Sequence, residues 1–337
     1  MICWSHFGSR EHRGQFSISM RILIVGGIGF IGGRLAEHLF KIGHEIILGG
    51  RNLRNSPDWL PQAEVTRIEW NDESALQHSC DGVDVIIHAA GMNAQECAAN
   101  PVAALAINGL ATARLVAAAS RAKVKKIIYF STAHVYASPL IGKFDEESCP
   151  RNTHPYASSH LAGENAVLDA TKRGEIDGVV IRLSNAFGVP VHEHINCWKL
   201  LVNDLCRQAV EFNKCTLNTN GLEERDFISL TEVSRIVECL LYANVNHSEG
   251  IIFNLGTGES KTVLTMATLI QRRCAEFLGF EPELKYKNEG KIETLPSLIY
   301  GVGHLSKFGI KPSILSDIPE IDELLHFCQS TFSKGRP

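Results

Sequence analysis

Three regularly spaced glycines give the chain a candidate binding site for a diphosphate. Gly26, Gly29 and Gly32 lie in the run GGIGFIG, between a short apolar run and a helix-like segment. The first glycine would allow a tight turn, the second would let the backbone approach a pyrophosphate, and the third would let helix and strand pack closely. Free N–H groups of the helix that begins near Phe30 and Ile31 would face the phosphates. The turn therefore predicts that the chain binds a dinucleotide.

The residues after the second apolar run bear on which dinucleotide is bound. An acidic side chain at this place would hydrogen-bond the ribose 2′-hydroxyl of NAD. The sequence has Gly49, Gly50, Arg51 and Asn52 instead. The glycines leave room for a 2′-phosphate, and Arg51 could pair with it through two hydrogen bonds. This pattern favours NADP(H) over NAD(H), unless Arg51 is a solvated loop cation.

The elements that must position this turn alternate along the chain between strand and helix. Parallel neighbouring strands need such crossovers. The expected strands are 21–25, 46–50, 83–88, 126–130 and 178–182, and the expected helices include 101–121 and 156–173. The alternation predicts an α/β fold with a doubly wound parallel Rossmann sheet that has helices on both faces.

The alternation breaks after about residue 185, which indicates a second, smaller unit. A helix is expected at 198–211, and strands are expected at 227–230 and 251–254. We predict a dinucleotide-binding domain interleaved with a C-terminal substrate lobe. The expected boundaries are 1–19 for a disordered extension, 20–184 and 225–256 for the dinucleotide-binding domain, and 185–224 and 257–330 for the substrate lobe.

Composition argues against several other classes of protein. The chain of 337 residues has a net charge of −4, whereas a nucleic-acid binder usually has a basic excess. No stretch is apolar for long enough to span a bilayer, and residues 1–19 lack the apolar core of a signal peptide. The ten cysteines include no Cys-x-x-Cys pair. This spacing is typical of reduced thiols in a cytoplasmic protein.

Further motifs extend from the glycine turn to near the C-terminus. They are GGIGFIG (26–32), DVIIHAAG (84–91), NG (108–109), FSTAHVYA (130–137), YASSH (156–160), IRLSNAFG (181–188), ERDFISL (224–230) and FNLGTGES (253–260). Over about residues 20–325 the chain thus resembles the extended short-chain dehydrogenase/reductases, in the NAD-dependent epimerase/dehydratase branch that acts on nucleotide sugars. The motifs are specific for the family and not for one substrate.

The resemblance implies roles for individual residues. Thr132 matches the catalytic Ser/Thr of the family, and Tyr156 matches its catalytic tyrosine. The positions that would border the cofactor are Ala89, Ala90, Gly91, Asn108 and Ser184, together with Tyr156 and His160. Asn185 and Arg225 match positions that usually touch the nucleotide sugar.

The chemistry of this pair can be derived from the side chains. Moving a hydride between C4 of nicotinamide and a carbinol carbon requires moving a proton on the same oxygen. The Tyr156 hydroxyl can carry that proton if its pKa is drawn down from about 10. Thr132 would hold the substrate oxygen by a hydrogen bond.

Position 160 departs from the family pattern, which has a lysine four residues after the tyrosine. That lysine lies on the same helix face as the tyrosine, lowers its pKa and hydrogen-bonds the nicotinamide ribose. His160 has a shorter reach and, with an unperturbed pKa of about 6.5, is mostly neutral. Three interpretations stay open: His160 is a working substitute, it marks lost or weak catalysis, or it is displaced from the site.

The strand-end sequence narrows the reaction. Some dehydratases of the family carry Thr-Asp-Glu where this chain has Thr132, Ala133 and His134, which argues against a 4,6-dehydratase. The first hypothesis is therefore an NAD(P)-dependent 4-epimerase or ketoreductase that transfers a hydride at a carbinol carbon of a nucleotide sugar. The alternatives are a catalytically weakened, dinucleotide-binding regulatory protein and a reductase of a non-sugar carbonyl compound.

Other partners follow from the same resemblance. The Ala-rich helices at 101–121 and 157–172 would form a four-helix interface in a homodimer. Residues 285–300 lack the arginine that the family often uses for the sugar-nucleotide diphosphate. Either Lys287 or Lys291 replaces it, or the substrate is not a nucleotide sugar. His192 and His194 have no third ligand nearby in the sequence, so no metal site is predicted.

Overall fold

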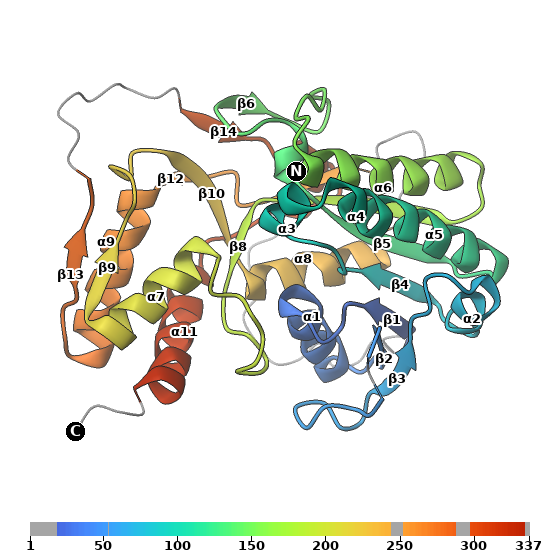
Figure 1. Cartoon of the computed structure of the whole chain (residues 1–337), viewed down its shortest axis with the longest axis horizontal. Helices are drawn as coiled ribbons and strands as arrows, with labels where there is room; N and C mark the ends of the chain where they lie inside the picture. Colours follow the sequence, from blue (N-terminus) through green and yellow to red (C-terminus); the bar gives the residue numbers. More distant parts are fainter. Residues whose placement is uncertain (1–18, 53, 244–251, 288–296, 334–337) are drawn as a thin grey trace, which may run out of the picture.

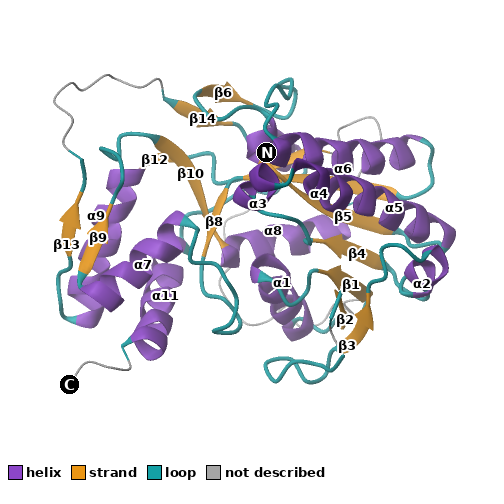
Figure 2. Cartoon of the chain, viewed as in Figure 1, coloured by secondary structure: helices purple, strands orange, loops and turns teal. Residues whose placement is uncertain are grey.

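A computed structural model describes residues 19–52, 54–243, 252–287 and 297–333. The extension predicted at 1–19, the start of the strand predicted at 251–254, and Lys291 lie largely or wholly outside these residues. Seven parallel strands form the central sheet in the order β11-β7-β5-β4-β1-β2-β3 (Figures 1 and 2). Their bounds are β1 Arg21–Val25, β2 Glu45–Gly50, β3 Glu64–Arg67, β4 Val85–His88, β5 Lys126–Thr132, β7 Asp177–Leu183 and β11 Ile252–Leu255.

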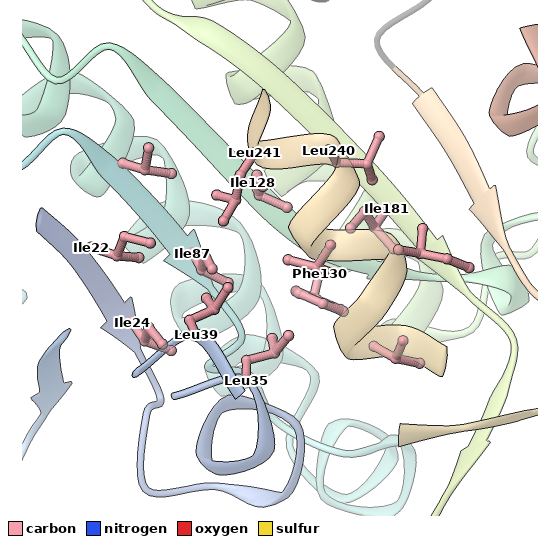
Figure 3. Close-up of a cluster of buried hydrophobic side chains, with 14 of the residues drawn as sticks. Ile22, Ile24, Leu35, Leu39, Ile87, Ile128, Phe130, Ile181, Leu240 and Leu241 are labelled. Carbon is pink, nitrogen blue, oxygen red and sulfur yellow. The ribbon is translucent and has the colours of Figure 1, made fainter. Parts of the chain in front are cut away.

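Helices cover both faces of this sheet, which confirms the predicted Rossmann architecture. On one face lie α1 (Phe30–Lys41) and α8 (Leu230–Tyr242). Figure 3 shows Leu35 and Leu39 of α1 and Leu240 of α8 directed at isoleucines of the sheet. The other face is covered by α2 (Glu73–His78), α5 (Ala111–Arg121) and α6 (Pro155–Lys172). Because the parallel strands are covered on both faces, they read as continuous apolar runs.

The predicted helix at 101–121 is not a uniform α-helix. It consists of α4 (Pro101–Ala104), the π-helical turn η1 (Leu105–Leu110) and α5, and it follows the short helix α3 (Ala94–Ala99). By length and apolar composition alone this run could cross a membrane, so the expectation that no stretch is apolar for long enough is wrong. Half of its most apolar window is buried inside the protein. The π turn matters for the site because it carries Asn108.

Short strands and helices outside the large sheet form a smaller lobe, at the left of Figure 1. Its strands are β8 (Asn185–Phe187), β10 (Glu224–Ser229) and β12 (Ser260–Thr262) in one sheet, and β9 (Lys214–Thr216) with β13 (Glu283–Lys285) in another. A further pair, β6 (Gly142–Phe144) and β14 (Leu298–Tyr300), lies above the carboxyl ends of β5 and β7. The helices here are α7 (Leu201–Phe212), α9 (Val263–Arg273) and α11 (Asp317–Phe332), with the π turn η3 (Cys274–Leu278) after α9. Helix α10 (Gly303–Lys307) packs instead against β11 of the large sheet.

The sequence-based boundaries differ from the observed ones in identifiable ways. The range 225–256, predicted to belong to the first domain, contributes to two sheets: β10 pairs with β8 and β12, and β11 pairs with β7. Helix α7 begins at Leu201 rather than at 198. Strand β3 was not predicted, because its sequence EVTR contains a single apolar residue.

The core of the smaller lobe is rich in cysteine. Helices α7, α9 and α11 pack around it, and its buried thiols are Cys206, Cys215, Cys274 and Cys328, with Cys197 buried close by. All nine cysteines in the described part of the chain are free. Burial raises the pKa of each of these thiols, Cys274 to about 12 for example, so they remain protonated and unreactive in the folded protein.

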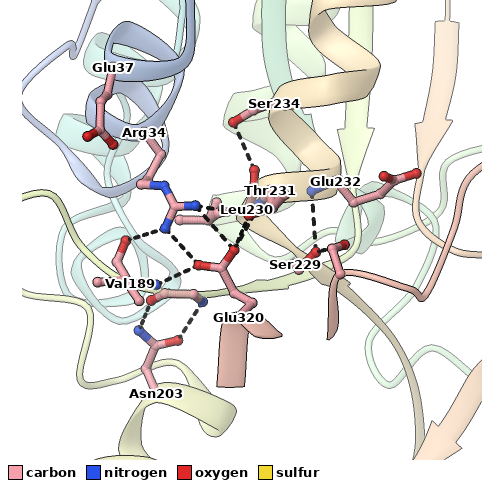
Figure 4. A network of polar contacts seen from close by, with 12 residues as sticks. Arg34, Glu37, Val189, Asn203, Ser229, Leu230, Thr231, Glu232, Ser234 and Glu320 are labelled. Atoms are coloured by element: carbon pink, nitrogen blue, oxygen red, sulfur yellow. Dashed lines mark hydrogen bonds and ion pairs between the residues drawn. The ribbon is translucent and has the colours of Figure 1, made fainter. Parts of the chain in front are cut away.

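One buried carboxylate joins the two lobes. Glu320 of α11 accepts hydrogen bonds from Arg34 of α1 at 2.7 Å, from the Val189 N–H at 2.9 Å and from Thr231 of α8 (Figure 4). Gly188 leaves the space that its side chain occupies, because a Cβ there would overlap Glu320 Oε1. Arg34 also donates to the Val189 carbonyl at 3.0 Å. The loop after β8 is thereby fixed to the helix that follows the glycine turn.

Candidate active site

The glycine turn has the geometry that its sequence predicts. Gly26 has φ +87°, and a Cβ on it would lie 2.8 Å from the Ala90 nitrogen. A Cβ on Gly32 would overlap the Gly26 carbonyl oxygen, so helix α1 can approach the strand only without a side chain. Helix α1 begins after Gly29 with no side-chain cap, which leaves its first N–H groups to another acceptor. The cradle fits a dinucleotide diphosphate.

The turn lies at the topological switch point of the sheet. β1 is flanked by β2 on one side and β4 on the other, so the crossovers to them run in opposite directions. Ligands of open α/β sheets bind outside the carboxyl ends of the strands at such a point. Gly26 contacts the backbone of Ala89 and Ala90 there, directly after β4. Phe30 and Ile31, also expected at the cofactor, are the first two residues of α1.

Tyr156 and Thr132 are brought together from two elements. Thr132 is the last residue of β5, and Tyr156 lies in the first turn of α6. Burial raises the pKa of Tyr156, while hydrogen bonding with the Thr132 side chain opposes that shift. Within the described residues no lysine or arginine contributes to the pKa of this tyrosine. The phenol is therefore protonated at neutral pH.

Hydrogen bonds at two places along α6 position Thr132 and Tyr156. Glu164, two turns after Tyr156 on α6, accepts from Arg182 of β7 at 2.7 Å and from Ser131, the neighbour of Thr132. At the start of α6, His154 Nδ1 accepts from the Tyr156 N–H at 3.2 Å. Asn152 connects the two sides, because its amide donates to the His134 carbonyl at 2.7 Å and its oxygen accepts from the His154 N–H.

His160 lies beside Tyr156 and is buried. The two rings meet edge to face with centroids 4.7 Å apart, so His160 is not displaced from the site. Burial lowers the pKa of His160 to about 4. The imidazole is therefore neutral at pH 7 and cannot supply the positive charge of a lysine. Its Nδ1 is 3.0 Å from the Tyr129 hydroxyl.

Gly91, in the loop after β4, lies next to both Asn108 and His160. A Cβ on Gly91 would lie 3.1 Å from Asn108 Oδ1 and 3.7 Å from His160 Nε2. The Asn108 side chain already bonds within the protein, accepting from the Met92 N–H at 2.8 Å and donating to Ser159 Oγ at 3.0 Å. It joins the β4 loop to α6 and thereby fixes the place where Gly91 faces His160.

Ser184 and Asn185 are held by a carboxylate that sequence reasoning missed. Asp226 accepts from Ser184 Oγ at 2.8 Å and from the Thr257 and Gly258 N–H groups at 3.0 and 2.7 Å, and its carbonyl accepts from the Asn185 amide. Burial raises the pKa of Asp226 to about 6. Its only signal in the sequence was its place in the motif ERDFISL, directly after Arg225.

Comparison with known proteins decides the family. The sequence model of the NAD dependent epimerase/dehydratase family matches residues 22–256, well over half of the chain. The chain belongs to this family.

Individual members and a solved structure agree with that assignment. The dTDP-D-glucose 4,6-dehydratase of Bos taurus is 27% identical over 263 residues, covering 74% of this chain and 72% of the relative. The dTDP-6-deoxy-L-talose 4-dehydrogenase (NAD(P)(+)) of Kitasatospora kifunensis is 28% identical over 257 residues, covering 74% and 78%. The structure of UDP-N-acetylglucosamine 4-epimerase from Methanobrevibacter ruminantium M1, in complex with UDP-N-acetylmuramic acid, superposes with a TM-score of 0.78 at 20% identity, covering 93% and 99%.

The residues expected to bind the substrate in this epimerase/dehydratase family member include an exposed arginine. Arg225 is 40% exposed, and its ion-pair partner among the described residues is Glu223, at 3.9 Å. Burial lowers the pKa of His134, and the charge of Arg225 lowers it further, which indicates that the two side chains are near each other. Lys287 lies at the end of the described segment after β13, where its N–H donates to the Thr219 carbonyl.

The remaining predicted residues lie on loops. Arg51 and Asn52 follow β2, as expected from the sequence, and both are exposed. His192 and His194 lie in the loop after Gly188, and the His192 ring accepts from the His194 N–H at 3.2 Å. Within the described residues no three His, Cys, Asp or Glu side chains are grouped as metal ligands.

Proposed function

We propose that this family member is a nucleotide-sugar ketoreductase, which reduces a carbonyl carbon of the sugar to a carbinol with Tyr156 as proton donor. The observation that carries the proposal is that Tyr156 has Thr132 and a neutral His160 beside it and no cation among the described residues that acts on it. A bound NAD(P)H would supply the hydride from C4 of its nicotinamide. The protein supplies the proton and the orientation.

The protonation state of Tyr156 favours the reductive direction. Reduction consumes a phenol proton, and a phenol whose pKa lies above its usual value of about 10 keeps that proton at neutral pH. Oxidation of a carbinol needs the phenolate, which at pH 7 is about one molecule in a thousand even at the unperturbed pKa of about 10. The Thr132 hydroxyl would hold the carbonyl oxygen while Tyr156 donates to it.

A 4-epimerase is the second candidate, because the residues Thr132 and Ala133 at the end of β5 resemble those of epimerases. An epimerase begins by oxidising its substrate, and that step needs the Tyr156 phenolate. Without a lysine at position 160 to lower the Tyr156 pKa, this oxidation would be slowed the most. The positive nicotinamide of oxidised cofactor would be the only charge left to draw down the Tyr156 pKa. The acids of a 4,6-dehydratase are replaced by Ala133 and His134, so elimination lacks its acid and base.

We further propose that the cofactor is held by the glycine turn and by the loop after β4, with Arg51 at the adenosine ribose. The family is NAD dependent. An exposed arginine after β2, with no acid beside it, supports use of NADP(H) as well. Titration of the protein with NADH and NADPH, for wild type and Arg51→Ala, tests this point, because only the affinity for NADPH should fall.

A homodimer is also proposed, paired through the face formed by α4, η1 and α5. Val102, Leu105 and Leu110 on this face are 80%, 55% and 50% exposed. Exposed apolar side chains that are grouped on one helical run are typical of an interface. Light scattering should give a mass near twice 37.1 kDa, and Val102→Glu should shift the protein to the mass of one chain.

The experiment that tests the proposed reaction is an assay with reduced cofactor and a panel of nucleotide-linked keto sugars, followed by the loss of NAD(P)H absorbance. Wild type should turn over, whereas Tyr156→Phe should lose at least about a hundredfold in kcat. Tyr286→Phe, at an exposed tyrosine, is the matched control and should be unchanged. If dinucleotide binds but no sugar or non-sugar carbonyl is reduced and no hexose is epimerised, the regulatory alternative replaces this proposal.

A further inference from the structure

Behind His160 lies a buried tyrosine that the reaction itself does not use. Tyr129 is on β5, three residues before Thr132, and its side chain is fully buried. Its hydroxyl lies in a space that exists only because residue 163 of α6 is glycine, since a Cβ there would come within 2.5 Å of that oxygen. The hydroxyl is 3.0 Å from His160 Nδ1.

The Tyr129 hydroxyl is hydrogen-bonded to His160 Nδ1 and to the Thr112 side chain. The two carbonyl oxygens in reach, those of Asn108 at 3.3 Å and of His160 at 3.5 Å, are longer contacts. The Asn108 carbonyl already accepts a hydrogen bond of 2.7 Å from Thr112 Oγ1. Burial raises the pKa of Tyr129 well above its usual value, so the phenol keeps its proton and can donate it to Nδ1.

The state of the imidazole follows from that bond. Burial lowers the pKa of His160 to about 4, so the ring carries a single proton at neutral pH. If Nδ1 accepts from Tyr129, that proton must be on Nε2. A tautomer is fixed by the hydrogen bond that the other ring nitrogen makes.

The free nitrogen faces the dinucleotide site. A Cβ on Gly91, in the loop after β4, would lie 3.7 Å from His160 Nε2. Nε2 makes no hydrogen bond to any described residue, yet it is not sealed inside the protein. His88 Nδ1 gives the contrast, because it is both unpartnered and fully enclosed.

We propose that Tyr129 is a positioning residue which holds His160 in the Nε2–H tautomer and so presents an N–H donor to the hydroxyl groups of the bound dinucleotide. The proposal rests on the proposed function, because it assigns His160 to the cofactor site. In the family pattern one lysine has two roles: it hydrogen-bonds the cofactor and it lowers the tyrosine pKa by its charge. The hydrogen bond to the cofactor is kept through the Tyr129–His160 pair, while the positive charge beside Tyr156 is given up.

The tautomer can be measured without cofactor or activity. Long-range proton–nitrogen correlation spectra of ¹⁵N-histidine-labelled protein at pH 7 distinguish a protonated ring nitrogen from a bare one. His160 is assigned by the signals that vanish in His160→Gln. We expect the Nε2–H pattern in wild type and a mixed or Nδ1–H pattern in Tyr129→Phe. An Nδ1–H pattern in wild type, or no change in Tyr129→Phe, would overturn the proposal.

A double-mutant cycle on cofactor affinity tests the consequence. Calorimetric titration with NADH and NADPH is run on wild type, Tyr129→Phe, His160→Lys and the double variant. Tyr129→Phe should weaken binding by about fivefold in the wild-type background, the worth of one ordinary hydrogen bond. In the His160→Lys background it should weaken binding by less than about twofold, because an ammonium group has no tautomers to select. Equal losses in both backgrounds would mean that Tyr129 is merely structural, and the proposal would be wrong.

Failure of the function and failure of this inference are distinguishable. If wild type binds neither dinucleotide, the proposed function is wrong whatever the spectra show. If wild type binds and the wild-type spectrum has Nδ1 protonated, only the role of Tyr129 is wrong. Should Tyr129→Phe not fold, the wild-type spectrum alone still decides the tautomer.

Discussion

At the scale of single residues, the decisive feature is that a neutral ring occupies the position of a cation. His160 keeps the contact with Tyr156 that the spacing of four residues predicts, at 4.7 Å between ring centroids. It loses the charge, because burial disfavours the protonated form. The sequence shows that His160 replaces the family's lysine, but it does not show that the imidazole is buried.

The pH dependence of carbonyl reduction should therefore be featureless near neutrality. A His160 that activates Tyr156 by its charge would give an ionisation near its usual pKa of about 6.5. With the pKa of His160 at about 4 and that of Tyr156 raised, neither group titrates between about pH 6 and 8. We expect kcat/KM for reduction to stay level from about pH 7 to 8, above the pKa of about 6 of Asp226, the carboxylate that holds Ser184. His160→Lys should instead increase carbinol oxidation at about pH 8 by at least about tenfold, because each unit of Tyr156 pKa lowered gives about ten times more phenolate.

A stability prediction follows from the same buried histidines. Burial lowers the pKa of His88 to about 3 and that of His160 to about 4, whereas both are near 6.5 in the unfolded chain. Between these values the unfolded histidines bind more protons, so the contribution of His88 and His160 to the free energy of unfolding is full above about pH 6.5 and is lost as the pH is lowered toward about 4. Urea unfolding at several pH values should show that His160→Gln reduces this slope by up to about 1.4 kcal/mol per pH unit. His78→Gln, at a largely exposed histidine, should leave it unchanged.

At the scale of elements, local patterns were predictable and tertiary contacts were not. The glycine turn was found because three residues within one turn carry its geometry. Every strand of the large sheet except β3 was found, because burial on both faces makes these strands continuous apolar runs. Asp226 and Glu164 were missed, because their importance depends on donors far away in the chain, such as Ser184 for one and Ser131 for the other. The π turn η1 was hidden within an Ala-rich run that reads as one helix.

Removing one glycine should separate the turn from its ligand. In Gly32→Ala the new methyl group would overlap the Gly26 carbonyl, so α1 must move away from β1. We expect the affinity for NAD(P)H to fall by at least about tenfold and the free energy of unfolding to fall by about 1–3 kcal/mol. Gly303→Ala, where a Cβ meets only an ordinary contact at 3.8 Å, is the control for adding a methyl group. Unchanged cofactor affinity in Gly32→Ala would contradict the assigned site.

At the scale of the whole molecule, the smaller lobe is joined to the domain of the large sheet through Glu320. Its side chain is fully buried and receives its hydrogen bonds from Arg34, Val189 and Thr231. Because Arg34 follows the glycine turn and Val189 follows β8, Glu320 joins the two segments that we propose to bind the cofactor and the substrate. Neither the pairing nor its burial can be read from residues that are 286 positions apart.

Neutralising this carboxylate should loosen this connection. Glu320→Gln keeps the shape but leaves the Arg34 charge, which is 14% exposed, without its partner. We expect the free energy of unfolding to fall by about 3–5 kcal/mol, as is typical when one member of a buried ion pair is removed. Glu37→Gln, which breaks the exposed pair with Lys41 on the same helix, should cost less than about 1 kcal/mol. Denaturant titration measures the free energy of unfolding of both variants. Equal losses in Glu320→Gln and Glu37→Gln would mean that the buried ion pair stabilises the protein no more than the exposed one.

The cysteine-rich core of the smaller lobe has a consequence for observing such loosening. Its thiols are enclosed by α7, α9 and α11 and are held in the unreactive, protonated form. A thiol reagent can therefore reach Cys206, Cys215, Cys274 and Cys328 only while this lobe is open. The rate at which these four are modified, located by mass spectrometry apart from the exposed Cys149, measures how often the smaller lobe opens.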